Sequence, residues 1–207
     1  MRSSNSLRSL LRGRRLDSCP GDAQVGTASR DPLTLLLDER GLGETASSME
    51  PGGAALVLFA VDGLRRVGGA HDIADEILVR LADRLRSARR DRDALARIDV
   101  DRLAVLLTGL DDPERDGVAA ADRMLGALAA PIEVHGLRLE VELVVGVGFS
   151  ERPTLTALLA AADAALSGAR RAGRGIAATR RAEIAEPTVA DEIASFAQMR
   201  RGSRRVA

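Results

Sequence analysis

The sequence has almost no aromatic residues and no lysine. Its 207 residues include three phenylalanines and neither tryptophan nor tyrosine, which excludes modules that stack bases on aromatic side chains. Arginine supplies every basic side chain other than the two histidines, so a single arginine says less about binding than it otherwise would. Hydrophobic residues still make up 45% of the chain, which predicts a buried core of Leu, Val, Ile and Ala.

The chain also lacks paired cysteines, net charge and long apolar runs. Cys19 is the only cysteine, so no disulfide can form within the chain, which fits a reducing compartment. The formal net charge is zero, so no overall field attracts a polyanion. The longest apolar runs, near 54–61 and 139–149, are too short to span a bilayer, and the N-terminus has no signal-peptide pattern. We therefore expect a cytoplasmic protein that binds no nucleic acid and has no membrane span.

Three regions differ in composition. Residues 1–30 are rich in Ser, Gly and Arg, and we interpret them as a disordered basic arm, with contact to acidic partners or lipid as the alternative. Residues 31–181 carry the periodic segments and form the predicted domain. Residues 182–207 are predicted to be a tail with a short helix at 190–199.

The apolar pattern of residues 31–181 predicts alternating strands and helices. The continuous run 54–61 (AALVLFAV) fits a strand buried on both faces, and apolar residues at helical spacing follow at 72–89. The other predicted elements are a helix at 36–49, a hairpin of 95–98 and 103–108, a helix at 113–129, a hairpin of 132–134 and 137–147 turning at His135-Gly136, a helix at 154–170 and an edge strand at 176–179. This order predicts an α/β sandwich of the ferredoxin-like, palm type, in which helices flank a mostly antiparallel central sheet.

Four short motifs occur in order along the predicted domain. They are 31–34 (DPLT), 61–67 (VDGLRRV), 71–78 (HDIADEIL) and 162–174 (ADAALSGARRAGR). Together they resemble the motifs DxLTGL, IDxFKxI, GHxxGDxxL and ADxALYxAKxxGR of the bacterial GGDEF, or diguanylate cyclase, family. The resemblance implies the fold of that family and a role in cyclic-di-GMP signalling. In active members two GTP-loaded domains face each other, with divalent ions held by carboxylates.

The signature hairpin of that family is altered in this chain. Where the family reads RxGG[D/E]EF, residues 97–103 read RIDVDRL. Asp99 puts a negative charge in the nucleotide position, Val100 is β-branched and poorly suited to positive φ, and Arg102 replaces the second acid. Ala60 stands where the family has a metal-binding aspartate. These departures predict a chain that is no enzyme, holds no Mg²⁺ and has no catalytic residue.

Part of the cyclase site persists in the sequence. Asp101 remains at the hairpin, Asp75 in the third motif, and Arg170 and Arg174 on the phosphate side. The resemblance implies that these four residues form a vestigial nucleotide site. A different strand register would move Asp62 into the place of the lost aspartate. Two distant histidines and one cysteine form no metal motif.

A second site of the family is matched more fully. Many of its cyclases bind their product at an inhibitory site with the signature RxxD, five residues before the hairpin motif. Residues 90–93 read RDRD at that spacing, and Arg123, in a stretch ADRM, matches a further arginine from the next helix. Arginine binds phosphate bidentately and stacks on bases, and a carboxylate accepts from the guanine edge. We therefore predict a cyclic-di-GMP site of Arg90, Asp93 and Arg123, with a relic of an active ancestor as the alternative.

The sequence alone is compatible with three functions. The first is an inactive GGDEF-type module that binds cyclic-di-GMP at this site and changes its contacts with a partner protein or a second copy of itself. The second is a pseudoenzyme scaffold that binds protein without the ligand. The third is residual cyclase activity, against which Ala60, Asp99 and Arg102 weigh.

Overall fold

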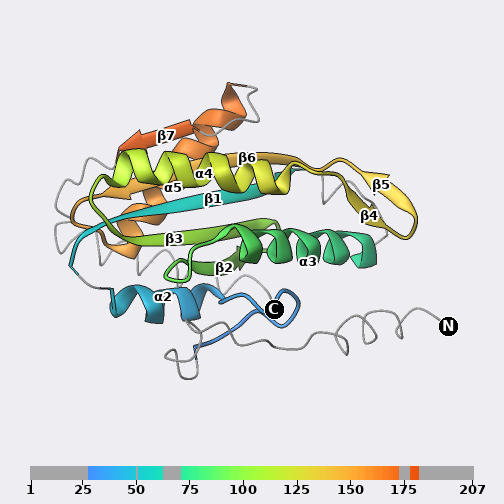
Figure 1. The fold of residues 1–207 in the computed structure, drawn as a ribbon, viewed down its shortest axis with the longest axis horizontal. Coiled ribbons are helices and arrows are strands. Elements are labelled where there is room, and N and C mark those ends of the chain that lie inside the picture. The colour runs from blue at the N-terminus through green and yellow to red at the C-terminus, as the bar shows by residue number, and fades with distance from the viewer. Residues whose placement is uncertain (1–27, 50, 63–70, 173–177, 182–207) are drawn as a thin grey trace, which may run out of the picture.

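The computed structural model describes residues 28–49, 51–62, 71–172 and 178–181. In these ranges a five-stranded sheet has the order β2-β3-β1-β6-β7, and β4 and β5 form a separate two-stranded sheet (Figure 1). The elements are α2 (Glu39–Ser47), β1 (Gly53–Asp62), α3 (His71–Ala88), β2 (Ala94–Asp99), β3 (Arg102–Leu110), α4 (Pro113–Leu128), β4 (Ile132–Val134), β5 (Leu137–Leu139), β6 (Glu142–Ser150), α5 (Leu155–Arg171) and β7 (Ala178–Arg181).

Strand β1 is the centre of the larger sheet and joins two hydrophobic cores. It runs antiparallel to β3 and β6, and residues 53–61 are buried. Because successive side chains of a strand point to opposite faces, Val57 and Phe59 pack with α3 and α4, whereas Leu56 and Leu58 pack with α2 and α5. The continuous apolar run therefore reflects a sheet that is covered on both faces.

The predicted α/β sandwich with a mostly antiparallel sheet is confirmed, and among the strands of the described ranges only β7 pairs in parallel. The β2–β3 hairpin and the helices α4 and α5 lie where the sequence placed them. The predicted helix 36–49 begins later, at Glu39, because the Asp38 side chain accepts from the Gly41 backbone N–H (2.8 Å) and caps it. The predicted edge strand 176–179 lies at 178–181. The helix predicted at 190–199 lies outside the described residues.

One predicted strand, 137–147, is wrong. Strand β5 ends at Leu139 and pairs with β4, whereas β6 begins at Glu142 and pairs with β1. The apolar pattern continues across the break, so it carries no sign that the two halves have different partners. The turn at His135 and Gly136 was predicted correctly: their φ values are 51° and 79°, as a two-residue hairpin turn requires.

Both predicted boundaries of the domain stay predictions, since residues 1–27 and 182–207 lie outside the described part. Ser29 and Arg30, which the sequence assigned to the arm, already contact the domain. The Ser29 carbonyl accepts from the Asp38 N–H (3.1 Å), and Arg30 bridges to Leu37. The Ser29 hydroxyl also donates to the Asp38 carboxylate, which lowers the pKa of Asp38.

Two glycines bring α5 against the backbone of β6. A Cβ on Gly146 would lie 2.6 Å from the Leu166 nitrogen, and one on Gly148 would lie 2.7 Å from the Ala162 nitrogen. A side chain at either position would therefore push the helix away. This close approach carries Asp163 and Arg170 of α5 to the end of the sheet where β1 ends and β3 begins. Within the described residues, no helix is both long enough and apolar enough to cross a membrane.

Candidate functional site: the hairpin end and the end of α3

The β2–β3 hairpin closes without the backbone conformations that glycine allows. Among the described residues other than glycine, only Leu35 and His135 have positive φ. Val100 therefore sits at the tip in an ordinary conformation, with its side chain exposed. Asp99 pairs with Arg102 across the turn. The hairpin thus accommodates Asp99 and Val100 by adopting a turn that needs no glycine.

Arg97 ties this hairpin to the first motif of the domain. Its Nη1 lies 3.1 Å from Asp31 Oδ2, and both side chains are 15% exposed. Its other nitrogens donate to the carbonyl oxygens of Asp99 (3.2 Å) and Val100 (3.1 Å). Asp31 also accepts from the backbone N–H and the hydroxyl of Thr34, at 2.7 Å each. Arg97 therefore stabilises the turn, a role that the sequence did not indicate.

Two ion pairs cross from the strand ends to α5. Arg102 Nη1 lies 2.7 Å from Asp163 Oδ1, and Arg170 Nη2 lies 2.6 Å from Asp62 Oδ1. Arg170, predicted to face phosphate, thus faces an aspartate of its own chain. Asp163 lies in the ADxAL motif, but the sequence does not show that α5 approaches the hairpin.

The residues at this end do not fit the two divalent ions of the family chemistry. Ala60 is buried, pairs with Arg102 across the sheet and offers no side-chain ligand atom. Arg102 itself brings a positive charge, and the carboxylates of Asp62 and Asp163 are already paired with arginines. Groups of three or more His, Cys, Asp or Glu able to hold a metal are absent from the described ranges.

Two further residues predicted for the vestigial nucleotide site, Asp101 and Asp75, lie within the described ranges. Asp101 is at the hairpin, and its backbone carbonyl accepts from Val61 N–H (2.9 Å). Asp75 lies partly buried on α3, without an ion pair to another described residue. Arg174 lies outside the described residues. The vestigial nucleotide site stays a prediction.

At the other end of β2, a tight turn follows α3. The Asp93 N–H donates to the Arg90 carbonyl (3.0 Å), and Asp93 Oδ2 accepts from the Arg90 backbone N–H (2.8 Å). Arg89 Nη1 donates to the Asp93 carbonyl (3.0 Å). Asp93 is only 3% exposed. The expectation of a carboxylate open to a guanine edge is thus not met: Asp93 is buried, and one of its oxygens closes the turn.

Arginine charges surround this buried carboxylate. Burial raises the pKa of Asp93, while the Arg90 backbone N–H and the charges of Arg90, Arg123 and Arg92 oppose that rise. Arg123 reaches across from α4, and its Nε donates to the Ala88 carbonyl at the end of α3 (3.3 Å). The structure therefore brings together the three residues Arg90, Asp93 and Arg123 that the sequence grouped.

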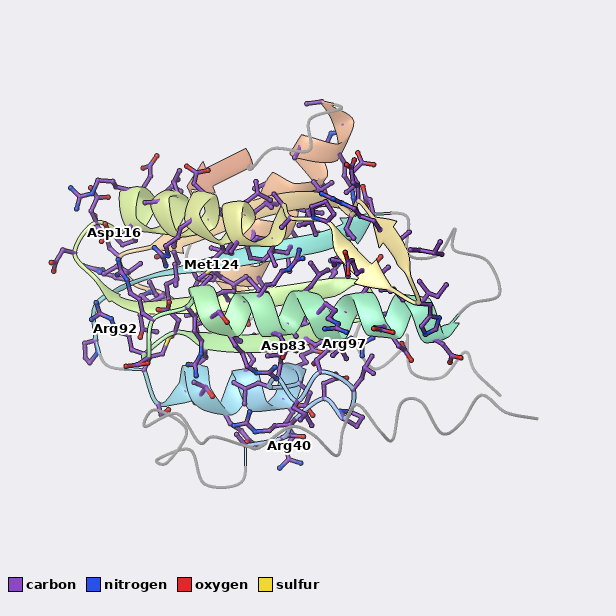
Figure 2. All side chains as sticks on the ribbon, turned by 45° about the vertical axis from the view of Figure 1, so that its right-hand side comes forward. Arg40, Asp83, Arg92, Arg97, Asp116 and Met124 are labelled. Carbon is purple, nitrogen blue, oxygen red and sulfur yellow. The ribbon has the colours of Figure 1, made fainter. Side chains whose placement is uncertain are left out.

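The turn after α3 and the hairpin tip are separate places. Strand β2 has six residues and connects them, so at about 3.3 Å per residue they lie roughly 20 Å apart. Figure 2 shows Arg92 and Arg97, which belong to the two places, well separated along the molecule. A change at the hairpin therefore need not disturb the arginine cluster.

The protein-family model that describes the GGDEF domain of diguanylate cyclases matches residues 29–175 of this chain. This chain belongs to the GGDEF family. The diguanylate cyclase TpbB of Pseudomonas aeruginosa is 34% identical over 125 residues, which cover 59% of this chain and 28% of TpbB. An uncharacterized signaling protein of Caulobacter vibrioides is 33% identical over 163 residues, covering 72% of this chain and 20% of that protein. The chain thus spans less than a third of either relative.

Solved GGDEF structures agree with the fold. The diguanylate cyclase SiaD of P. aeruginosa, solved in complex with its activator SiaC, is 28% identical with a TM-score of 0.66, over 74% of this chain and 62% of SiaD. The isolated GGDEF domain of TpbB is 27% identical with a TM-score of 0.64, over 73% of this chain and 99% of that domain.

Proposed function

We propose that this chain is a catalytically silent GGDEF domain that acts as a cyclic-di-GMP-binding signalling module through Arg90, Asp93 and Arg123. The observation that carries the proposal is the convergence of Arg90 and Arg123 on the turn that Asp93 closes. Guanidinium groups bind phosphate and stack on guanine. Since Asp93 is buried and its Oδ2 accepts from the Arg90 backbone N–H, its contribution is to hold the turn that carries Arg90, and the two arginines contact the ligand.

Catalytic silence is supported at the hairpin. The Arg170–Asp62 ion pair engages the arginine expected on the phosphate side, Arg102 brings a positive charge to the hairpin, and Ala60 has no side-chain ligand atom. We expect no cyclic-di-GMP when the protein is incubated with GTP and Mg²⁺ or Mn²⁺ and the products are separated by chromatography. A GGDEF domain with an intact signature, assayed in parallel, is the positive control. Product formed over multiple turnovers would contradict the proposal.

Ligand binding is tested by titration calorimetry with cyclic-di-GMP. Removing a charged hydrogen-bonding group costs about 1.5–3 kcal/mol, so Arg90→Ala should weaken binding roughly ten- to hundredfold. The matched control is Arg115→Ala, which removes the same charge from an exposed position on α4, where Arg115 pairs with Asp112 and Asp116.

The alternative is a scaffold that binds protein without the ligand. It is favoured by the burial of Asp93, because closing a turn is a sufficient structural role for the second residue of the signature. SiaD, a relative by structure, was solved with a partner protein. If the wild type shows no binding at high micromolar ligand, or if Arg90→Ala binds equally well, the scaffold replaces the ligand-binding module.

A further inference from the structure

The ribbon formed by β4 and β5 leaves one edge of β5 unpaired among the described residues. Strand β5 pairs with β4 alone, and Figure 1 shows this ribbon at one end of the molecule. Val134 and Leu137 flank the two-residue turn and exchange hydrogen bonds, and the pattern alternates along the strand. The backbone N–H and C=O groups of Arg138 and Glu140 therefore point away from β4. Neither residue forms a backbone hydrogen bond to a described residue outside the ribbon.

The ribbon is packed onto the domain, so its open edge is already formed. Ile132 and Val134 of β4 are buried in the core that α3 and α4 cover, and Leu139 of β5 packs against the same core. At the turn, His135 Nε2 lies 3.5 Å from Oε2 of the buried Glu76 on α3. An extended edge that is held in place loses little conformational entropy when another strand pairs with it.

The side chains along this edge are available for a contact. Leu137 is 55% exposed, which is unusual for a large apolar side chain in this domain. Arg138 and Glu140 are exposed as well. Neither forms an ion pair within the described ranges, although Glu133 of β4 lies opposite Arg138. An open strand edge with an exposed apolar side chain is a template for pairing with another strand.

The segment 137–141 (LRLEV) is complementary to itself in the antiparallel direction. When Leu139 lies opposite Leu139 of a second copy, Arg138 lies opposite Glu140, and Leu137 lies opposite Val141. This register also sets the outward backbone groups of Arg138 against those of Glu140, as a hydrogen-bonded pair requires. Shifting one strand by two residues keeps the hydrogen bonds but sets Arg138 against Arg138, or Glu140 against Glu140. Like charges directly opposite are destabilising, so the charges select the first register.

We propose that β5 pairs antiparallel with β5 of a second copy of this chain, which joins the two ribbons into one continuous sheet about a two-fold axis. Both copies use the same residues, as a closed two-fold contact requires. Five residues from each copy make a small interface, so the dimer is weak and forms at high protein concentration. The contact uses no residue of the arginine cluster and needs no ligand, and it therefore goes beyond the proposed function.

The experiment is sedimentation equilibrium of the full chain, without ligand, at concentrations up to about 1 mM. The mass of the wild type should rise with concentration from monomer toward dimer. Arg138→Glu sets like charges opposite each other at both charged pairs and should weaken association about tenfold or more. Glu140→Arg should do the same, and the double change Arg138→Glu with Glu140→Arg should restore association. The control Arg115→Glu reverses an exposed charge on α4 and should behave as the wild type.

Mixing the two single variants tests the register directly. Arg138→Glu and Glu140→Arg each repel a copy of themselves, but one variant meets the other with opposite charges at both pairs. The mixture should therefore associate as the wild type does, while each variant alone stays monomeric. Thermal melts of the dilute proteins should agree with the wild type, because both side chains are exposed and pair with no described residue.

Three results would overturn the inference. A wild type that stays monomeric at about 1 mM would leave the edge to a strand of another protein. Charge variants that associate as strongly as the wild type would show that the copies meet elsewhere. Association that requires cyclic-di-GMP would assign the contact to the arginine cluster. Because the ribbon and that cluster share no residue, the strand pairing and the proposed function can fail separately.

Discussion

Asp62 and Asp93 are both aspartates beside arginines, and burial separates their chemistry. The Asp62 side chain is 35% exposed and pairs with Arg170, so solvent screens the pair and its contribution to stability is small, about 0–1 kcal/mol. Asp93 is 3% exposed, and burial raises its pKa. Its charge therefore costs free energy that the surrounding arginines and the Arg90 N–H only partly offset.

The raised pKa of Asp93 predicts a pH dependence of stability. Above the ordinary value of 3.8 and below the raised one, the folded protein binds more protons than the unfolded chain. The free energy of unfolding of the wild type, relative to that of Asp93→Asn, should therefore fall as pH rises through this interval. Asparagine can still accept from the Arg90 N–H, so the turn is kept. Urea unfolding of both proteins between about pH 4 and pH 7 measures the difference; a constant difference would contradict the assignment.

At the scale of elements, arginines hold α3 and α4 together in an antiparallel pair. Arg84 of α3 donates to the carbonyls of Leu128 (3.1 Å), Ala130 and Pro131 (2.7 Å), where α4 ends. Arg123 of α4 donates in return to Ala88. These bonds use carbonyls that a helix end leaves unpaired. They also set the distance between the two helices that carry the arginine cluster.

Removing Arg84 should therefore loosen the α3–α4 pair. Arg84→Ala is expected to lower the free energy of unfolding by about 1–3 kcal/mol, because it leaves partly buried carbonyls without a donor. Arg40→Ala, which removes an exposed pair with Glu44 on α2, should have a much smaller effect, since solvent screens the pair. Equal effects of the two changes would show that the carbonyl contacts contribute nothing.

The packing of α5 on β6 gives a second prediction for elements. Gly146→Ala should destabilise the protein by about 1–3 kcal/mol or more, since the added methyl group would overlap the α5 backbone. Gly168→Ala is the control within α5: a Cβ there meets nothing within 4 Å, and alanine should stabilise the helix by about 0.5–1 kcal/mol. Thermal melts of both variants test the pair; a Gly146→Ala protein as stable as the wild type would contradict the close approach.

At the scale of the whole molecule, the arginines at the two ends of the domain differ in how they are paired. The hairpin end is closed by ion pairs within the chain. The end after α3 presents arginines that pair with no aspartate of the described residues. The same sheet supports both ends, because β2 starts at one and finishes at the other. The proposed loss of the cyclase site is therefore compatible with the proposed binding of a ligand at the other end.

The N-terminal boundary is a property of the whole domain and can be tested by truncation. The composition of residues 1–27 predicts that their removal leaves the melting temperature unchanged. Removing residues 1–30 should lower it by several degrees, because the contacts of Ser29 with Asp38 and of Arg30 with the Leu35 carbonyl (3.1 Å) are lost. Identical melts for the two truncated proteins would place the boundary at Asp31, as the sequence predicted.

The sequence by itself determined the family, the order of most elements and the altered hairpin. These features depend on local patterns: the period of the apolar residues, the turn residues and short motifs. It also grouped Arg90, Asp93 and Arg123, through their spacing in a known signature.

Only the tertiary structure decided the partners of the charged residues. Arg102 and Asp163 are 61 positions apart, and Arg170 and Asp62 are 108 apart, so no local pattern relates them. The burial of Asp93 and the break between β5 and β6 likewise follow from which segments pack together. Packing is set by contacts between distant parts of the chain, and those contacts determine whether a charged side chain is paired, buried or left for a ligand.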